Sequence, residues 1–262
     1  MALDLPVPDH IVIGSGKLFF NRLLDDGTYE GFIYLAETPG FTLNVTAENL
    51  TVDGSDGPIA ERIRDIPIRI VRTSTFNCRD FSPENAALFL VGSTGSVAQS
   101  NTPVTDEAHT VNQGRFYQLG TSSTNPGGVR NVSAVTVTGA GGTPTYVAGD
   151  DYVVHAEMGM LQIVSGGGIA NDTAILVDYT PATETRTRVT SHQQRPARGE
   201  LKFVADNTDG PNQDVLIPHA VLAANGDLAL KSREGPIEMP FTLNVQTRTG
   251  YAQVYIDGRA AV

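Results

Sequence analysis

Only one stretch of this chain, residues 81–92, combines the signals that start, continue and stop a helix. Ser82 can cap free backbone N–H groups, and Pro83 suits the first helical position because its missing donor costs nothing there. Glu84 favours the positive end of the helix dipole, an apolar body follows, and Gly92 can take the left-handed conformation that closes a helix. Almost all the remaining chain must therefore fold as strands and turns around one short helix.

The composition agrees with a chain of short strands and many turns. The 262 residues include 27 Gly and 15 Pro but no Trp, and Thr and Val are frequent. Gly and Pro dominate turns, whereas β-branched residues favour strands. The sequence therefore predicts a mainly β fold, and its length allows one large β domain or two smaller ones.

The clearest alternation lies in residues 41–52, FTLNVTAENLTV. Successive strand residues point to opposite faces, so an apolar core face and a wet polar face are predicted. The predicted core face carries Phe41, Leu43, Val45 and Ala47, and the polar face carries Thr42, Asn44, Thr46 and Glu48. The pentapeptide FTLNV recurs at 241–245. If both strands join one sheet, Thr242, Asn244 and Gln246 share that polar face.

A long hairpin is predicted from the turn-forming loop at 53–58 and the returning strand at 61–78, which is expected to place Ile66, Ile68 and Ile70 on one face. Its tip carries polar and charged side chains of both signs: Asp53, Ser55, Asp56, Glu61, Arg62 and Arg64. Two interpretations are open for this tip. It is either a solvated turn or an arm that docks on a neighbouring copy through salt-sensitive pairs.

Three segments are expected along the chain. Residues 1–108 and 182–262 form the two parts of a core domain, with the helix at 82–91 in the first part. Residues 109–181 form an inserted small β-sandwich, with strands near 132–138, 144–147, 151–155, 159–164 and 174–180 separated by Gly-rich turns. The stretch from 97 to 115 is polar and predicted as mostly loop.

Charge and cysteine content exclude some functional classes. The formal net charge of −11 argues against a partner held by phosphate attraction, which needs a basic surface. Cys78 is the only cysteine, so no intrachain disulfide is expected and a reducing cytoplasm is the simpler setting for folding. The sequence is expected to lack a signal peptide and a membrane-spanning segment.

No catalytic or metal-binding pattern is convincing. The GSGK at 14–17 lacks the first glycine of a phosphate loop and the Ser or Thr after its lysine, and no GxSxG elbow occurs. The five histidines have no metal-ligand spacing. Asp150 and Asp151 could hold calcium, although adjacent carboxylates in such a turn more often serve the turn itself. A non-enzymatic protein without cofactor or metal is expected.

Several stretches together resemble the major tail tube protein of long-tailed, non-contractile bacteriophages. They are FNCRDFSPENAALFLVG, GRFYQLG, NPGGVRNVSAVTV, YVAGDDYVV, GMLQIVSGGG, ILVDYTP and GELKFVADNTDGPNQDVLIPHAVLAANGDLALKSREGPIEMPFTLNVQ. The resemblance covers most of the chain and consists of strand, helix and turn patterns.

The resemblance implies a β-sandwich or half-barrel with one flanking helix, in which residues 109–181 form an outward-facing, immunoglobulin-like insertion. Six copies would form a ring, and rings would stack helically into a hollow tube around a tape measure protein. Tail terminator and distal tail or baseplate proteins would be further partners, and DNA would pass through the lumen without specific binding. The protein would be assembled in the host cytoplasm and located in the virion tail, with no membrane contact.

On this view the polar faces at 42–48 and 242–246 line the lumen, and the hairpin tip contacts the adjacent ring. The helix is expected to pack Leu88, Phe89 and Leu90 against the apolar face of the sheet formed by 41–52, 61–78 and 241–248. Two other functions compete with this one. The inserted module could be an adhesin that attaches to a host surface or carbohydrate, or the chain could be a β-sandwich hydrolase.

Overall fold

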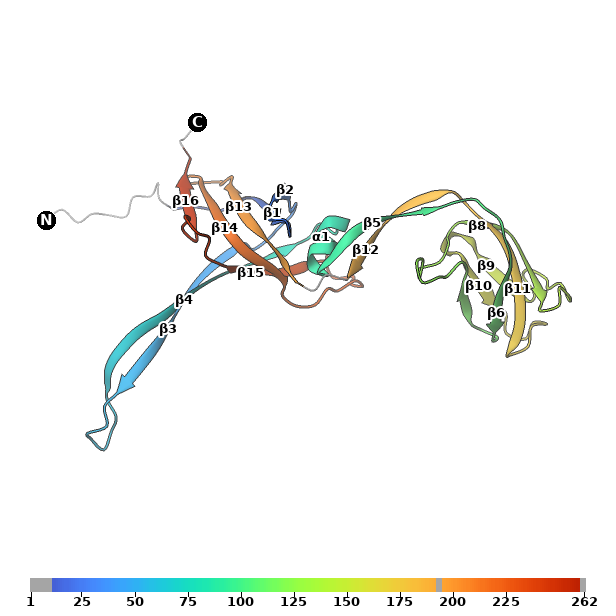
Figure 1. Cartoon of the computed structure of the whole chain (residues 1–262), viewed down its shortest axis with the longest axis horizontal. Helices are drawn as coiled ribbons and strands as arrows, with labels where there is room; N and C mark the ends of the chain where they lie inside the picture. The colour runs from blue at the N-terminus through green and yellow to red at the C-terminus, as the bar shows by residue number, and fades with distance from the viewer. Residues whose placement is uncertain (1–10, 192–194, 260–262) are drawn as a thin grey trace. The chain divides into compact units, whose positions relative to one another are not determined.

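The computed structural model describes residues 11–191 and 195–259, and the mainly β prediction is confirmed. The chain divides into two compact units (Figure 1). Unit 1 combines the residues before Ser96 with those after Thr187, and unit 2 is Ser96–Thr187. Unit 2 is wider than the predicted 109–181 segment. It includes the strand Val104–Val111, which was predicted as loop and pairs with a strand near the other end of the unit.

Unit 1 is built on an antiparallel sheet of eight described strands, ordered β2-β1-β13-β14-β15-β4-β3, with β16 also paired to β14. The strands are β1 (Gly16–Leu23), β2 (Tyr29–Tyr34), β3 (Thr42–Asp53), β4 (Arg62–Cys78), β13 (Ala197–Ala205), β14 (Gln213–Ala224), β15 (Met239–Val245) and β16 (Tyr255–Gly258). The rings of Phe41, just before β3, and Phe203, on β13, stack with centroids 5.3 Å apart. Since three strands separate β13 from β3 in the sheet, this contact requires the sheet to curl strongly.

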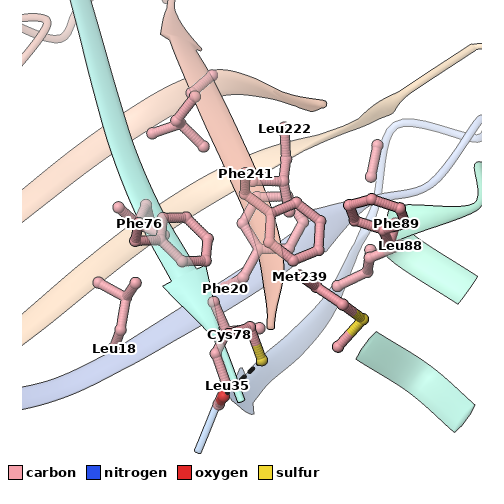
Figure 2. Close-up of a cluster of buried hydrophobic side chains, with 14 of the residues drawn as sticks. Leu18, Phe20, Leu35, Phe76, Cys78, Leu88, Phe89, Leu222, Met239 and Phe241 are labelled. Carbon is pink, nitrogen blue, oxygen red and sulfur yellow. Dashed lines mark hydrogen bonds between the residues drawn. The ribbon is translucent and has the colours of Figure 1, made fainter. Parts of the chain in front are cut away.

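The core of unit 1 lies inside this curl (Figure 2). Phe76 of β4 stacks on Phe241 of β15 at 5.3 Å, and Phe20 of β1 is fully buried beside them. The Cys78 thiol donates a hydrogen bond to the Leu35 carbonyl at 3.2 Å. Burial raises the pKa of this thiol to about 11, so the sulfur stays protonated and unreactive at neutral pH.

The α-helix α1 (Pro83–Phe89) begins as its sequence predicts, with Ser82 Oγ accepting a hydrogen bond from the Asn85 N–H. It packs against β14 and β15, and Phe89 meets Phe241 edge to face at 5.6 Å. The expected closure by Gly92 is wrong, because Val91 has the positive φ of 50° instead. Gly92 begins the next strand, where an added Cβ would collide with the Thr190 carbonyl oxygen. A glycine is therefore required at position 92 because the backbone of Thr190 passes so close to it.

Strands β5 (Gly92–Gln99) and β12 (Glu184–Ser191) pair as a two-stranded sheet. Each contributes residues to both units, so they carry the chain out of unit 1 and back again. Ser191 Oγ donates a hydrogen bond to the Leu90 carbonyl at 2.7 Å, which ties the returning strand to the end of α1.

Unit 2 contains two three-stranded antiparallel sheets that share one apolar core. The first has the order β6-β11-β8 and the second has the order β7-β10-β9. Their bounds are β6 (Val104–Val111), β7 (Phe116–Gln118), β8 (Val132–Gly139), β9 (Tyr152–His155), β10 (Met160–Ile163) and β11 (Thr173–Pro181), with a 3-10 turn at η2 (Ala156–Met158). The strand predicted near 144–147 is replaced by an isolated bridge between Thr138 and Thr145.

Two polar side chains organise unit 2: Glu107, which is half-buried, and Gln99, which is buried. Both carboxylate oxygens of Glu107 accept hydrogen bonds from the Gly120 N–H, at 3.0 and 3.1 Å, and the same carboxylate accepts one from the Tyr179 hydroxyl. His109 Nε2 lies 3.0 Å from Glu107 Oε1. Gln99 donates to the Arg130 and Ala182 carbonyls and accepts from the Arg130 N–H. These hydrogen bonds attach the segments at Gly120 and Arg130, which lie outside strands, to Glu107 of β6 and Gln99 of β5.

Candidate assembly surfaces

The two FTLNV segments lie in one sheet, on either side of β4 and in matching register. Thr42 and Thr242 both pair with Thr75, and Asn44 and Asn244 both pair with Thr73. Because neighbouring strand residues point to opposite faces, Thr242 and Asn244 lie on the sheet face opposite the buried Phe241 and Leu243. Their paired residues on β4 and β3 lie on that same face. The shared polar face predicted from the repeat is therefore present.

The other predicted lumen residues extend this face. Thr46 and Glu48 continue along β3, and Glu48 forms an ion pair with Arg69 at 2.6 Å, in which both side chains are exposed. The charge of Glu48 is thus locally compensated. Gln246 follows the end of β15 and is exposed, and its N–H donates to the His219 carbonyl.

The opposite, apolar face of the same strands is buried near the core of unit 1 and becomes exposed to solvent along the β3–β4 hairpin. Leu43 and Leu243 flank Ser74 in one row, yet Leu243 is fully buried and Leu43 is 36% exposed. Further along the hairpin, Val45 is 56% exposed and Ile70 is 54% exposed. The predicted core face of residues 41–52 is therefore wrong beyond Leu43, because no described element of the chain packs against it there.

We call residues 45–72 of the β3–β4 hairpin the arm, which extends away from the rest of the unit 1 sheet (Figure 1). A register shift at Glu48 and Asn49 pairs Ile66 with Leu50, whereas Ile70 pairs with Ala47. The prediction that the isoleucines at 66 and 70 share a face is consequently wrong. The arm exposes large apolar side chains on both faces: Val45, Leu50, Val52, Ile59, Ile63, Ile68 and Ile70.

The predicted contact loop forms the end of the arm. Asp53 and Arg62 close the strand pairing, and Gly54 N–H donates to the Glu61 carbonyl at 2.8 Å. All the predicted tip residues, Asp53, Ser55, Asp56, Glu61, Arg62 and Arg64, are exposed. Ile59, which sequence reasoning did not select, is the most exposed of the large apolar residues in the described chain, at 81%. The available sequence signal was an isoleucine directly after the turn-forming residues 53–58.

The eight-stranded sheet also has free edges at both ends of its strand order. Strands β2 and β3 stand at opposite ends of the strand order, so each has one side without a strand partner among the described residues. Edge strands expose N–H and C=O groups that can pair with another chain. The twelve-residue β3 is long for an edge strand.

The expected role of the helix needs two corrections. Besides β15, the helix packs against β14, which the expected sheet of 41–52, 61–78 and 241–248 did not include. Leu88 and Phe89 lie in the core of unit 1, but Leu90 is the C-cap residue and is 40% exposed. The first four residues of the apolar run are buried, and Leu90 is exposed because it lies where the chain leaves the helix.

Polar clusters elsewhere have structural explanations. Asp151 uses both carboxylate oxygens to accept hydrogen bonds, from the Val147 and Gly168 N–H groups, which lower its pKa. This is turn chemistry. Among the described residues, no group of three or more His, Cys, Asp or Glu is arranged to hold a metal ion. His10 and His192 lie outside those residues. No helix in the described parts of the chain has the length and apolar character needed to cross a membrane.

The fold and surfaces thus define a mainly β protein with a curled sheet, an exposed apolar arm and an inserted β unit. Residues 11–232 match the model of a family described as protein of unknown function UCP028589. The match covers most of the chain, so the chain belongs to this family. No curated protein matches the chain.

Proposed function

We propose that this protein is a structural subunit that assembles with copies of itself into six-membered rings, which stack into the hollow tail tube of a long-tailed bacteriophage. The observation that carries the proposal is the arm. Its residues Val45 and Ile70 extend the buried apolar face of the sheet, but no described part of the chain packs against them. Solvent exposure of such an extended apolar surface is unusual for a monomer. Burying a half-exposed Val, Leu or Ile contributes on the order of 1 kcal/mol, and assembly would gain this at each exposed apolar residue of the arm that it covers.

The free edges of the sheet support the same proposal. Pairing β2 of one copy with β3 of the next would satisfy both rows of backbone groups and would join the sheets around a ring. The polar rows through Thr73 and Thr75 would then be available to line a wet channel. The uncharged side chains of this face, and the ion pair between Glu48 and Arg69, would attract phosphates only weakly. Weak attraction suits a channel through which DNA has to slide.

On this proposal the partners are other copies of the chain, a tape measure protein in the lumen, a tail terminator and distal tail or baseplate proteins. The protein acts in the virion tail after assembly in the host cytoplasm, and it catalyses no reaction. Unit 2 serves as an immunoglobulin-like module on the outside of the tube.

Electron microscopy of the purified protein tests the proposal. Rings or tubes are expected at high protein concentration, and replacing Val45 and Ile70 with Asp should leave folded monomers because burial of the arm then costs free energy. A double variant at Ser232 and Thr249, exposed residues outside the arm, is the control and should still assemble. A wild-type protein that remains monomeric at every concentration would count against the proposal.

A further inference from the structure

Three neighbouring strands of unit 2 each contribute one side chain to the same place on the outer face of a sheet. Phe116 of β7 lies directly opposite Gln162 of β10. His155 of β9 pairs with Met160, two residues before Gln162 and on the same face. The alternate residues Leu161 and Ile163 are fully buried in the core. The Phe116, His155 and Gln162 side chains therefore belong to the face that the core does not use.

Their contacts fix a defined chemical arrangement. The Phe116 ring is 49% exposed, and its centroid lies 5.3 Å from that of the His155 imidazole. His155 Nε2 lies 3.0 Å from Gln162 Oε1. Since an amide oxygen only accepts hydrogen bonds, Nε2 carries the hydrogen, and Nδ1 of the neutral ring is an acceptor. The Gln162 amide nitrogen remains a donor. Neither Nδ1 nor this nitrogen has another hydrogen bond within the described residues.

An aromatic face beside one free acceptor and one free amide donor has the chemistry that a sugar ring requires. The ring face carries partial negative charge and attracts polarised C–H groups, while adjacent hydroxyls can donate to Nδ1 and accept from the amide. A protein partner fits less well, because specific protein interfaces bury about 800 Å² on each side and this patch centres on one ring. We propose that Phe116, His155 and Gln162 bind a pyranose with equatorial hydroxyls, as in glucose or N-acetylglucosamine.

This site goes beyond tube assembly and does not depend on it. Saturation-transfer NMR on the full chain, with methyl β-glucoside and N-acetylglucosamine as probes, should show transfer to the sugar C–H protons. Phe116→Ala should weaken binding about tenfold, because it removes the aromatic face that contacts the sugar C–H groups. Gln162→Glu keeps the side-chain shape but removes the donor, and it should weaken binding as well.

Phe81→Ala is the matched control, since Phe81 is 46% exposed but lies in unit 1. It should leave the sugar signals unchanged. The proposal is overturned if neither sugar receives saturation, if folded Phe116→Ala binds the sugars as tightly as the unchanged protein, or if this face binds a protein or peptide instead of the sugars. Electron microscopy of the same variants separates the two proposals, because loss of sugar binding should leave rings and tubes intact.

Discussion

Asn44 and Asn244 pair with the same residue, Thr73, from opposite sides of β4. Together with the neighbouring threonines they make one uncharged polar face. If this face lines the lumen, lysines at both asparagine positions should attract passing phosphates by about 1 kcal/mol for each close contact in water. Phage particles carrying Asn44→Lys and Asn244→Lys should assemble normally but deliver their genomes several-fold more slowly. Delivery kinetics and tail counts measure the two effects separately.

Ser232→Lys provides the control for added charge, because Ser232 is exposed in the loop between β14 and β15 and belongs to neither FTLNV strand. Particles with this change should infect at the normal rate. Equal delivery rates for all variants would remove the lumen assignment while leaving assembly untouched.

Shortening the loop at 53–58 tests the end of the arm. The deletion should leave the core of unit 1 folded, because all but one of the loop residues are exposed and none contributes to the core cluster. If the protein assembles as proposed, growth of tubes should stop, because the deletion removes or displaces the side chains that would contact the next ring. Light scattering follows tube growth and circular dichroism follows folding. Normal polymerisation of the shortened protein would show that the tip is only a solvated turn.

Phe89→Ala should destabilise unit 1 by about 3–5 kcal/mol, because Phe89 is 8% exposed and packs against Phe241. Leu90→Ala is the matched control and should cost less than about 1 kcal/mol, since the side chain is 40% exposed. Urea unfolding of both variants measures the difference. Similar losses would mean that the helix packs through Leu90 after all.

Cys78 supplies a chemical probe of the same core. The thiol is buried with a raised pKa of about 11, so thiol reagents should not label the native protein at pH 8. Labelling should begin only when unit 1 opens, and its rate should rise in Phe89→Ala. Rapid labelling of the native wild-type protein would contradict the burial of Cys78.

Unit 2 should lose stability in acid through Glu107. Burial raises the pKa of this carboxyl, but the hydrogen bonds from His109, Tyr179 and Gly120 outweigh it, so the pKa lies below its ordinary value. A lowered folded-state pKa stabilises the protein above the unfolded-state value of about 4.3, and that contribution is lost as pH falls. Thermal unfolding between pH 6 and pH 3 should show a shallower pH dependence in Glu107→Gln. An unchanged slope would contradict this role.

The sequence predicted those features that depend on local chemistry. Ser82 and Pro83 set the helix start, and alternation placed β3 and β4 within a few residues of their observed ends. The repeat of FTLNV correctly indicated a shared polar face. These successes share a cause, because capping and alternation are properties of a few adjacent residues.

Tertiary features escaped prediction for equally physical reasons. Nothing in the alternation of Leu43 and Val45 tells where the covering layer ends, so an exposed apolar face looks the same as a buried one. The register shift at Asn49 lies opposite Pro67, a residue that sheets confine to edges and bulges, but the alternation of the isoleucines did not reveal it. The shift moved Ile66 to the other face. The cluster at Phe116 depends on the pairing of β7 with β10, which lies far along the chain from it. Pairing between strands, rather than any single strand, creates these features.

The pairing of β5 with β12 has a practical consequence for engineering this protein. Because the chain leaves unit 1 on one strand and returns on its direct neighbour, the two points of entry lie side by side. A foreign domain whose own ends are close together can therefore take the place of unit 2 without stretching either strand. The protein offers a natural grafting point, at which a chosen binding domain could be displayed on every copy of an assembly.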